Sequence, residues 1–221
     1  MSQMILFSQM TPPEGEREAF EEWYDDDHIA ARMSIPGFTR ARRYWETSQS
    51  GEVSDNHLAV YELDSQTLDT EPYRRLKADP GARTEDFLAR VTGFTRFTTE
   101  KISDAGTSGA IGRFLSVVAF AVPAEDEAQF EAWYSGEHVP LLLEADDWLR
   151  VHRYRVVSGE GGPWTHLALH ELASLEVMDS PERARARSGP LRDALAALPW
   201  FAESGRWLYD LRASHEARPA S

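Results

Sequence analysis

The segment "FEEWYDDDHI" (Phe20–Ile29) returns 110 positions later as "FEAWYSGEHV" (Phe130–Val139). The match continues without a gap to Tyr44 and Tyr154 and contains eight identical positions. Both copies keep the tryptophan-tyrosine pair and the histidine, whereas the aspartates of the first copy are replaced in the second. A duplication of this length predicts that the chain is built from two units of the same structure.

A second matching block lies further along each unit. "HLAVYEL" (His57–Leu63) and "HLALHEL" (His166–Leu172) share five of seven residues at an offset of 109. In both blocks the residues at every second position are aliphatic up to the glutamate, a period typical of a β-strand. Near the ends of the two units, Arg96 aligns with Arg206.

The predicted element order of each unit is β-α-β-β-α-β, that of the ferredoxin-like fold. We assign residues 1–102 to the first repeat, 103–112 to a small, polar linker, 113–212 to the second repeat and 213–221 to a flexible tail. Two helices cover one face of each antiparallel sheet, and the other face must also be buried. The sequence therefore predicts an α+β fold in which the sheets of two ferredoxin-like repeats face each other and close a single-chain, dimeric-type α+β barrel.

The composition of the chain excludes several classes of function. The 221 residues carry a net charge of −14 and include no cysteine. A chain without cysteine has no disulfides and no thiolate nucleophile, and an acidic surface repels nucleic acid. No apolar run has the length of a transmembrane helix, and the N-terminus lacks the features of a signal peptide. We therefore expect a cytoplasmic protein with no membrane partner.

The pattern F-x-x-W-Y-x-x-x-H, followed by R-x-x-R-Y, resembles the EthD-like branch of the dimeric α+β barrel superfamily. Members of that branch usually carry one ferredoxin-like unit per chain and form the barrel by dimerising, so this chain looks like a fused version. The superfamily includes cofactor-free monooxygenases, polyketide cyclases, muconolactone isomerases, haem-degrading enzymes and stress-induced barrels. The resemblance therefore implies a pocket without specifying its reaction.

Strand alternation selects the candidate site residues. His57 and Tyr61 share one face of their strand, and we expect this face to look into the barrel while the aliphatic face meets the helices. Alternation and the resemblance together put forward eight catalytic candidates, namely His28, Tyr44, His57, Tyr61, His138, Tyr154, His166 and His170. The candidates for substrate binding are Arg42, His152, Trp23 and Trp133.

These residue types are suited to proton transfer. Imidazole titrates near neutral pH, a tyrosine hydroxyl can donate to an enolate oxygen, and arginine can hold a carboxylate or a phenolate. We predict a cofactor-independent acid–base enzyme, an isomerase, cyclase or lyase, that acts on a small aromatic, polyketide-like or lactone substrate in the barrel cavity. The alternatives are a cofactor-free or haem-dependent monooxygenase and a non-catalytic, small-ligand-binding or stress-response barrel. The second repeat, which has more histidines, is favoured as the active one.

Several candidates also have a structural interpretation. His28 and His138 could cap the C-terminal end of a helix, and Asp25 and its neighbours would raise the pKa of His28. Arg43 and Arg153 are expected to form ion pairs with acids such as Glu62 and Glu171. His57 and His166 could bond loop carbonyls.

Cofactor motifs are weak throughout the sequence. It contains neither HExxH nor a two-histidine, one-carboxylate pattern, and it has no P-loop and no GxGxxG. We expect no metal and no cofactor, with haem as the lower-ranking alternative. The expected partner is a small hydrophobic or aromatic substrate, and the fused barrel could be a monomer or assemble further.

Overall fold

The computed structural model describes residues 3–217. The strands are β1 (Gln3–Thr11), β2 (Phe38–Thr47), β3 (Val53–Asp64), β4 (Thr92–Gly106), β5 (Phe114–Phe120), β6 (Trp148–Glu160), β7 (His166–Leu172) and β8 (Gly205–Glu216). The α-helices are α1 (Arg17–Trp23), α2 (Ala30–Met33), α3 (Glu71–Ala78), α4 (Ala82–Arg90), α5 (Glu127–Trp133), α6 (Val139–Leu142), α7 (Pro181–Ala186), α8 (Pro190–Ala196) and α9 (Pro199–Ala202).

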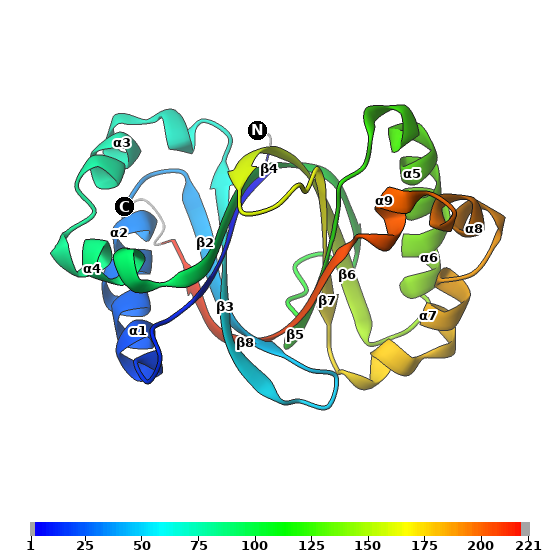
Figure 1. Cartoon of the computed structure of the whole chain (residues 1–221), viewed down its shortest axis with the longest axis horizontal. Coiled ribbons are helices and arrows are strands. Elements are labelled where there is room, and N and C mark those ends of the chain that lie inside the picture. The colour runs from blue at the N-terminus through cyan, green and yellow to red at the C-terminus, as the bar shows by residue number, and fades with distance from the viewer. Residues whose placement is uncertain (1–2, 218–221) are drawn as a thin grey trace.

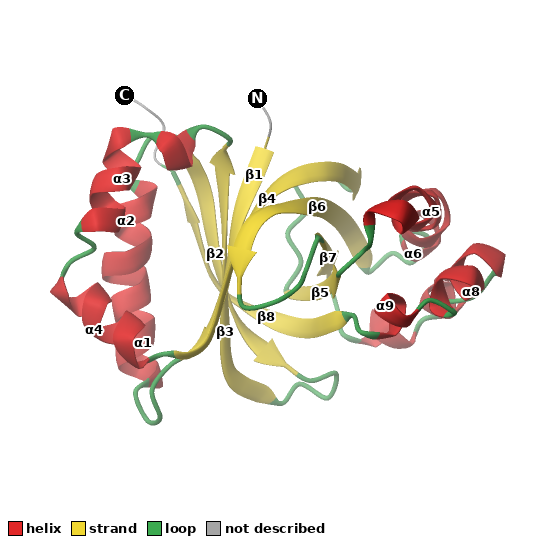
Figure 2. Cartoon of the chain, turned by 45° about the horizontal axis from the view of Figure 1, so that its top comes forward, coloured by secondary structure: helices red, strands yellow, loops and turns green. Residues whose placement is uncertain are grey.

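The eight strands form one closed antiparallel barrel in the order β1-β3-β2-β8-β5-β7-β6-β4. Each half of the chain supplies four neighbouring strands, and the halves join where β2 pairs with β8 and β4 pairs with β6. Helices α1–α4 lie on one outer side of the barrel and α5–α9 on the opposite side (Figure 1). The same two helical layers flank the strands in a second view (Figure 2). The predicted α+β class is confirmed.

Apolar side chains from both halves fill the inside of the barrel. Leu58 and Val60 of β3 lie in one buried cluster with Leu167 and Leu169 of β7. Fully burying an aliphatic side chain of this size contributes roughly 1.5–3 kcal/mol. The shared interior therefore holds the two halves together.

The outward face of β3 carries His57, Ala59 and Tyr61. Ala59 and Tyr61 belong to a buried cluster with the α1 residues Phe20 and Trp23, and the rings of His57 and Phe20 are 5.0 Å apart. The prediction that this face looks into the barrel is therefore wrong. Both faces of the strand are buried, and the fully aliphatic face is the one that meets the other sheet.

The barrel seams extend beyond the predicted repeat boundaries. Gly106 at the end of β4 pairs with Arg150 of β6, so the first four residues of the predicted linker are strand. Glu216 of β8 pairs with Arg40 of β2, so residues 213–216 of the predicted flexible tail are also strand, because ladder hydrogen bonds fix their main chain. Residues 218–221 lie outside the described part of the chain.

The helical cover of the second half is broken into short pieces. Pro181, Pro190 and Pro199 each stand at the start of a helix. Proline suits the first turn of a helix but cannot continue the previous one, since it lacks the N–H that the next hydrogen bond needs. The first half has the longer α3 and α4 at the corresponding place. Among residues 3–217, no helix is long and apolar enough to cross a bilayer.

Candidate active site

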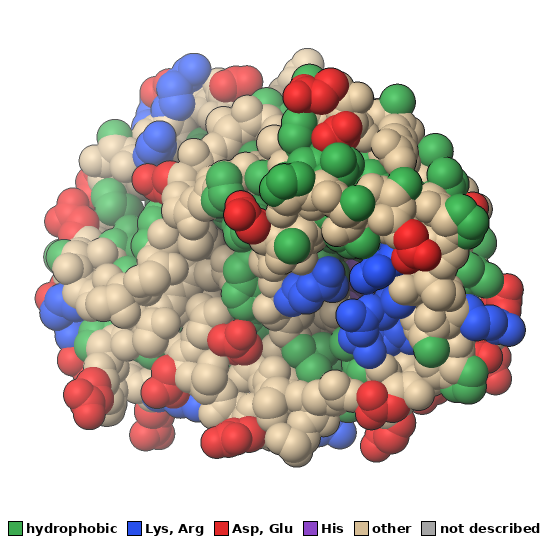
Figure 3. Space-filling view, turned by 45° about the vertical axis from the view of Figure 1, so that its right-hand side comes forward, with side chains coloured by type: hydrophobic (Ala, Val, Ile, Leu, Met, Phe, Trp, Pro, Cys, Tyr) green, Lys and Arg blue, Asp and Glu red, His purple; other side chains and the backbone are tan. Residues whose placement is uncertain are grey.

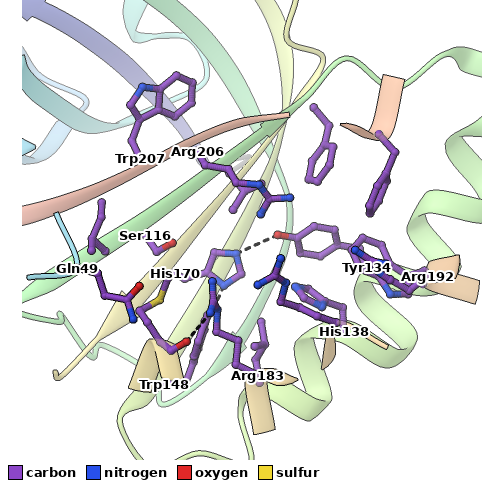
Figure 4. Close-up of a pocket in the computed structure, with 18 of the residues that line it drawn as sticks. Gln49, Ser116, Tyr134, His138, Trp148, His170, Arg183, Arg192, Arg206 and Trp207 are labelled. Carbon is purple, nitrogen blue, oxygen red and sulfur yellow. Dashed lines mark hydrogen bonds between the residues drawn. The ribbon is translucent and has the colours of Figure 1, made fainter. Parts of the chain in front are cut away.

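A cavity of about 340 Å³ lies between the second half's sheet and its helices. Ser116 of β5 and His170 of β7 form part of its floor, and Trp207 of β8 and Gln49 of the β2–β3 hairpin lie near its rim (Figure 4). The cavity is outside the barrel, whose interior is filled. The expected site in the barrel cavity is therefore wrong, because the open space lies on the helical side of the sheet.

Tyr134 and His138 enter the cavity wall from a π-helical turn that continues α5. Such turns are rare in proteins, and those that occur are often found at functional sites. The rings of Trp133 and His138 lie 4.6 Å apart at an interplanar angle of 33°. The chain then continues as α6, so the interpretation of His138 as a helix C-terminal cap is wrong. The repeated motif instead supplies three adjoining side chains of one cavity.

Trp148 of β6, His170 of β7 and Tyr134 form a hydrogen-bonded chain (Figure 4). The distance from Trp148 Nε1 to His170 Nδ1 is 3.1 Å, and that from His170 Nε2 to Tyr134 Oη is 3.0 Å. An indole N–H can only donate, so Nδ1 of a neutral His170 accepts and Nε2 carries the hydrogen. Nε2–H then donates to Tyr134 Oη, which leaves the tyrosine's own hydrogen free for a ligand.

The charge state of His170 follows from its burial. The side chain is 1% exposed, and burial lowers its pKa well below the usual value, with His138 and Arg153 adding to the effect. His170 is therefore neutral at pH 7, as the hydrogen-bonded chain requires.

His138 presents a lone pair to the cavity. Its Nδ1 lies 2.7 Å from the carbonyl oxygen of Ala186, and because a carbonyl only accepts, Nδ1 must carry the hydrogen. Nε2 has no protein hydrogen-bond partner within residues 3–217. Burial lowers the pKa of His138 to about 4, and Arg206 also lowers it. A neutral imidazole with a free, directed lone pair can act as a general base.

Four arginines line the same cavity, from α7, its C-terminal end, α8 and β8. They are Arg183, Arg187, Arg192 and Arg206. Glu46, which the first half contributes, is the one carboxylate among the lining residues in the described part of the chain. Lys and Arg side chains gather around a hollow on this face (Figure 3). A positive cavity on a chain of net charge −14 favours an anionic ligand.

The first half repeats several of these positions without the open space. Tyr24, His28 and Arg96 line a cavity of about 50 Å³, and His28 and Arg96 also line a second one of about 100 Å³, so both are smaller than the cavity of the second half. Phe87 of α4 stacks on Trp23 with the ring centroids 4.7 Å apart, which covers the place where the second half is hollow.

The environment of His28 differs from the expected one. Burial lowers its pKa well below the usual value, with Arg32 and His57 adding to the effect, so the expected rise in pKa is wrong. Asp25 does not act on His28, because its carboxylate is bound by the Arg43 side chain at 2.6 and 2.7 Å. His28 also lies inside a helical run that α2 continues, so it does not cap a helix end.

Four further candidates lie away from the cavity. Tyr44 and Tyr154 pack in the barrel interior. Arg42 Nη1 lies 2.5 Å from Glu171 Oε1, and both side chains are at most 3% exposed. His152 Nδ1 is 3.5 Å from Asp104. The structure therefore places these candidates in or beside the barrel core.

The arginine partners also differ from the prediction. Glu171 pairs with Arg42, whereas Arg153 pairs with Glu131 of α5 at 2.5 Å. Neighbouring residues of a strand point to opposite faces, and the expected pairing assigned the acids to the wrong arginine. The prediction that Arg43 and Arg153 form structural ion pairs is confirmed, with different acids.

The two histidines at the strand starts lie in the helix-facing core. His57 is fully buried beside Phe20, Tyr24 and Trp45, and neither ring nitrogen has a hydrogen-bond partner among the described residues. His166 Nδ1 lies 2.9 Å from the Thr165 hydroxyl. Neither histidine lines the cavity that contains His138 and His170.

Six residues of the cavity were not predicted from the sequence: Tyr134, Trp148 and the four arginines. Tyr134 stood in the repeated motif but was not among the candidates. The sequence carried a signal for these arginines, because residues 183–192 of an acidic chain contain four arginines, three of which line the cavity. Their convergence on one cavity depends on how α7, α8 and β8 pack.

No family model and no curated protein matches the chain. Solved structures do match. An anthrone oxidase-like protein superposes with a TM-score of 0.69 at 10% identity, covering 97% of this chain and 93% of that one. A presumptive monooxygenase from Fusobacterium nucleatum gives 0.63 at 8% identity, covering 97% and 94%. A chlorite dismutase variant from Candidatus Nitrospira defluvii gives 0.59 at 12% identity, covering 96% and 91%. These likenesses and the closed barrel show that the chain has the dimeric α+β barrel fold.

Proposed function

We propose that the second half's cavity is the active site of a cofactor-free oxygenase that acts on a small aromatic or polyketide-like substrate. The observation that carries the proposal is the convergence of a fixed base, the lone pair of His138, and a free hydroxyl hydrogen on Tyr134. The oxidase and monooxygenase names among the similar structures favour this alternative over an isomerase, cyclase or lyase.

The fused architecture fits the same proposal. Each half contributes its strands in one order, β4-β1-β3-β2 and β8-β5-β7-β6 read from opposite seams, and carries its own helical layer. We infer that the chain is a tandem pair of ferredoxin-like units of the EthD-like type. The first unit serves as a supporting wall, since the two cavities beside His28 are only about 50 and 100 Å³.

The chemistry needs a substrate with a CH₂ group whose carbanion is conjugated with a carbonyl, as in anthrone, where the two groups lie opposite each other on the central ring. His138 Nε2 removes a proton from this carbon, and Tyr134 donates a hydrogen bond to the enolate oxygen that forms. The carbanion form adds O₂ at carbon to give a hydroperoxide. Loss of the second C–H proton and of hydroxide leaves a new C=O, so one oxygen atom stays on the carbon and the other departs as water. Two hydrogens leave the carbon, O₂ takes the four electrons, and no external reductant is required.

The low pKa of His138 is compatible with this role. With a pKa of about 4, the imidazole holds no proton at pH 7 and is available as a base. An anionic substrate beside Arg206 and Arg187, two cations that depress this pKa, would offset their charge and raise the basicity of His138.

Haem does not fit the cavity. Both ring nitrogens of His170 are engaged, and only Nε2 of His138 remains as an axial ligand. Four arginines line the cavity, whereas the faces of a porphyrin are apolar and call for apolar side chains. The cavity of about 340 Å³ is also at the low end of the roughly 300–1,000 Å³ of ordinary ligand pockets. No step of the mechanism uses haem.

The proposal is tested by oxygen uptake with anthrone as the probe. We expect the wild-type protein to consume O₂ and form anthraquinone, and His138→Gln to lose about 100-fold or more of kcat. His28→Gln is the matched control, because His28 occupies the same motif position in the first half. Failure of the wild type to accelerate oxidation above the uncatalysed rate, or equal loss in both variants, would contradict the proposal.

A further inference from the structure

The four arginines of the cavity lack the partners that other arginines of the chain have. Arg153 is paired with Glu131, and Arg185, exposed on α7, is paired with Glu144. Within residues 3–217, Arg187 and Arg206 have no ion pair. Arg192 has only its exposed neighbour Asp193, at 3.6 Å.

The remaining arginine is held by the backbone. Arg183 donates to the carbonyl oxygen of Met178, which positions its guanidinium without neutralising it. Asp179 nearby stabilises its charged form, but burial together with Arg187 and Arg206 lowers the pKa of Arg183. Partial burial together with Arg187 and Arg192 likewise lowers the pKa of Arg206, with Tyr134 opposing the effect.

Such a cluster opposes its own folding, because like charges repel and partly lose their hydration. Groups held in an unfavourable electrostatic state are typical of binding and catalytic sites. The enolate of the proposed reaction carries a single negative charge, and its oxygen already receives a hydrogen bond from Tyr134. This enolate therefore does not account for four guanidinium groups in one cavity.

We propose that the substrate carries a carboxylate besides the carbon that is oxidised, and that Arg183, Arg187, Arg192 and Arg206 bind it. This inference rests on the proposed function and names its substrate class. The planar guanidinium group matches a carboxylate with two parallel hydrogen bonds. Phe120, Leu142 and Leu208 provide apolar wall for an aromatic ring.

A phosphate ester is the competing anion. Phosphate sites commonly use lysine and the backbone N–H groups of a glycine-rich loop. Among the described residues, the cavity lining contains neither lysine nor glycine. The lining therefore favours the carboxylate.

The test is equilibrium binding by calorimetry under nitrogen with three probes: 2-naphthoate, 2-naphthamide and 2-naphthyl phosphate. We expect naphthoate to bind about tenfold or more tightly than the neutral amide. Arg206→Gln and Arg183→Gln should each weaken naphthoate binding by about tenfold and leave amide binding unchanged. Arg185→Gln, on the same helix but outside the cavity, should change neither.

Three results would overturn the inference: equal affinity for naphthoate and amide, equal weakening by Arg185→Gln, or tighter binding of the phosphate. The binding assay needs no turnover, so it separates the two proposals. Arginine-dependent naphthoate binding without oxidation of anthrone would remove the proposed reaction and keep the anion site. Turnover of anthrone without tighter binding of naphthoate than of the amide would keep the proposed reaction and remove the anion site. Near-ultraviolet circular dichroism of each variant checks that it is folded.

Discussion

Trp148 donates its indole N–H to Nδ1 of His170 across 3.1 Å, and this bond determines where the hydrogen of Tyr134 can point. Without the indole donor, His170 could place its own hydrogen on Nδ1. Tyr134 would then donate to Nε2 and have no hydrogen left for a substrate. Trp148 therefore orients the hydroxyl hydrogen of Tyr134 toward the cavity, although Trp148 itself donates to His170 and not to a substrate.

Trp148→Phe tests this positioning role. We expect kcat to fall about tenfold with little change in KM, a fraction of the roughly 100- to 1,000-fold loss from removing an oxyanion donor outright. Tyr134→Phe should show that larger loss. Steady-state kinetics of anthrone oxidation make the comparison. If Trp148→Phe changed KM alone, the residue would serve packing and not donor orientation.

The buried histidines predict how stability depends on pH. Burial lowers the folded-state pKa of His28, His57 and His170 well below the usual value and that of His138 to about 4. In the unfolded chain each pKa returns to about 6.5. Between these values the unfolded state binds more protons, so stability is full above pH 6.5 and falls as the pH drops.

Urea unfolding between pH 7.5 and 5 measures this slope. Each of these histidines adds up to about 1.4 kcal/mol per pH unit to the fall in the unfolding free energy. A stability that stays flat between pH 6.5 and 5 would show that the histidines can bind protons in the folded state.

His57→Phe should make the protein more stable. Neither ring nitrogen of His57 has a partner, and the ring is surrounded by Phe20, Tyr24 and Trp45. A buried unsatisfied polar group costs about 1–3 kcal/mol, and phenylalanine removes it at similar size. We expect a higher Tm, with a larger gain at pH 5.5 than at pH 7.5. A lower Tm at both pH values would mean that the site cannot accept the larger ring.

Glu171→Ala should be strongly destabilising. The change leaves the buried guanidinium of Arg42 without its 2.5 Å partner and removes the acceptor of the Gly112 N–H. Losing one member of a buried ion pair costs about 3–5 kcal/mol. Glu216→Ala removes an exposed partner of Arg40 and is the control, with an expected cost below about 1 kcal/mol.

Denaturant unfolding of both variants, and of the double variant Arg42→Met with Glu171→Leu, completes this test. The double variant should be more stable than Glu171→Ala, because no buried charge is left unpaired. Similar unfolding free energies for Glu171→Ala and Glu216→Ala would contradict the assignment of a buried ion pair.

Much of the candidate site could be predicted and part of it could not. The repeated motif put forward His138 and Trp133, and the alternation of the strand His166–Leu172 put forward His170. The role of Trp148 could not be predicted from the sequence, because it depends on a hydrogen bond to His170 on the neighbouring strand. Three of the cavity arginines, Arg183, Arg187 and Arg192, lie close together in sequence. The fourth, Arg206, reaches the cavity from β8, and the sequence does not show that it joins them.

The sequence by itself determined the α+β class, because this follows from local periodicity, and its long internal match predicted two repeated units. Only the tertiary structure decided which face of each sheet meets the other sheet. Alternation separates the two faces of a strand, but it does not say which one the helices cover when both are buried. In this chain the aliphatic face of β7 fills the barrel, and the face with His170 looks toward the helices. That orientation moves the candidate active site from the barrel interior to the space beneath α5–α9, where the second copy of the opening motif, "FEAWYSGEHV", lines its wall.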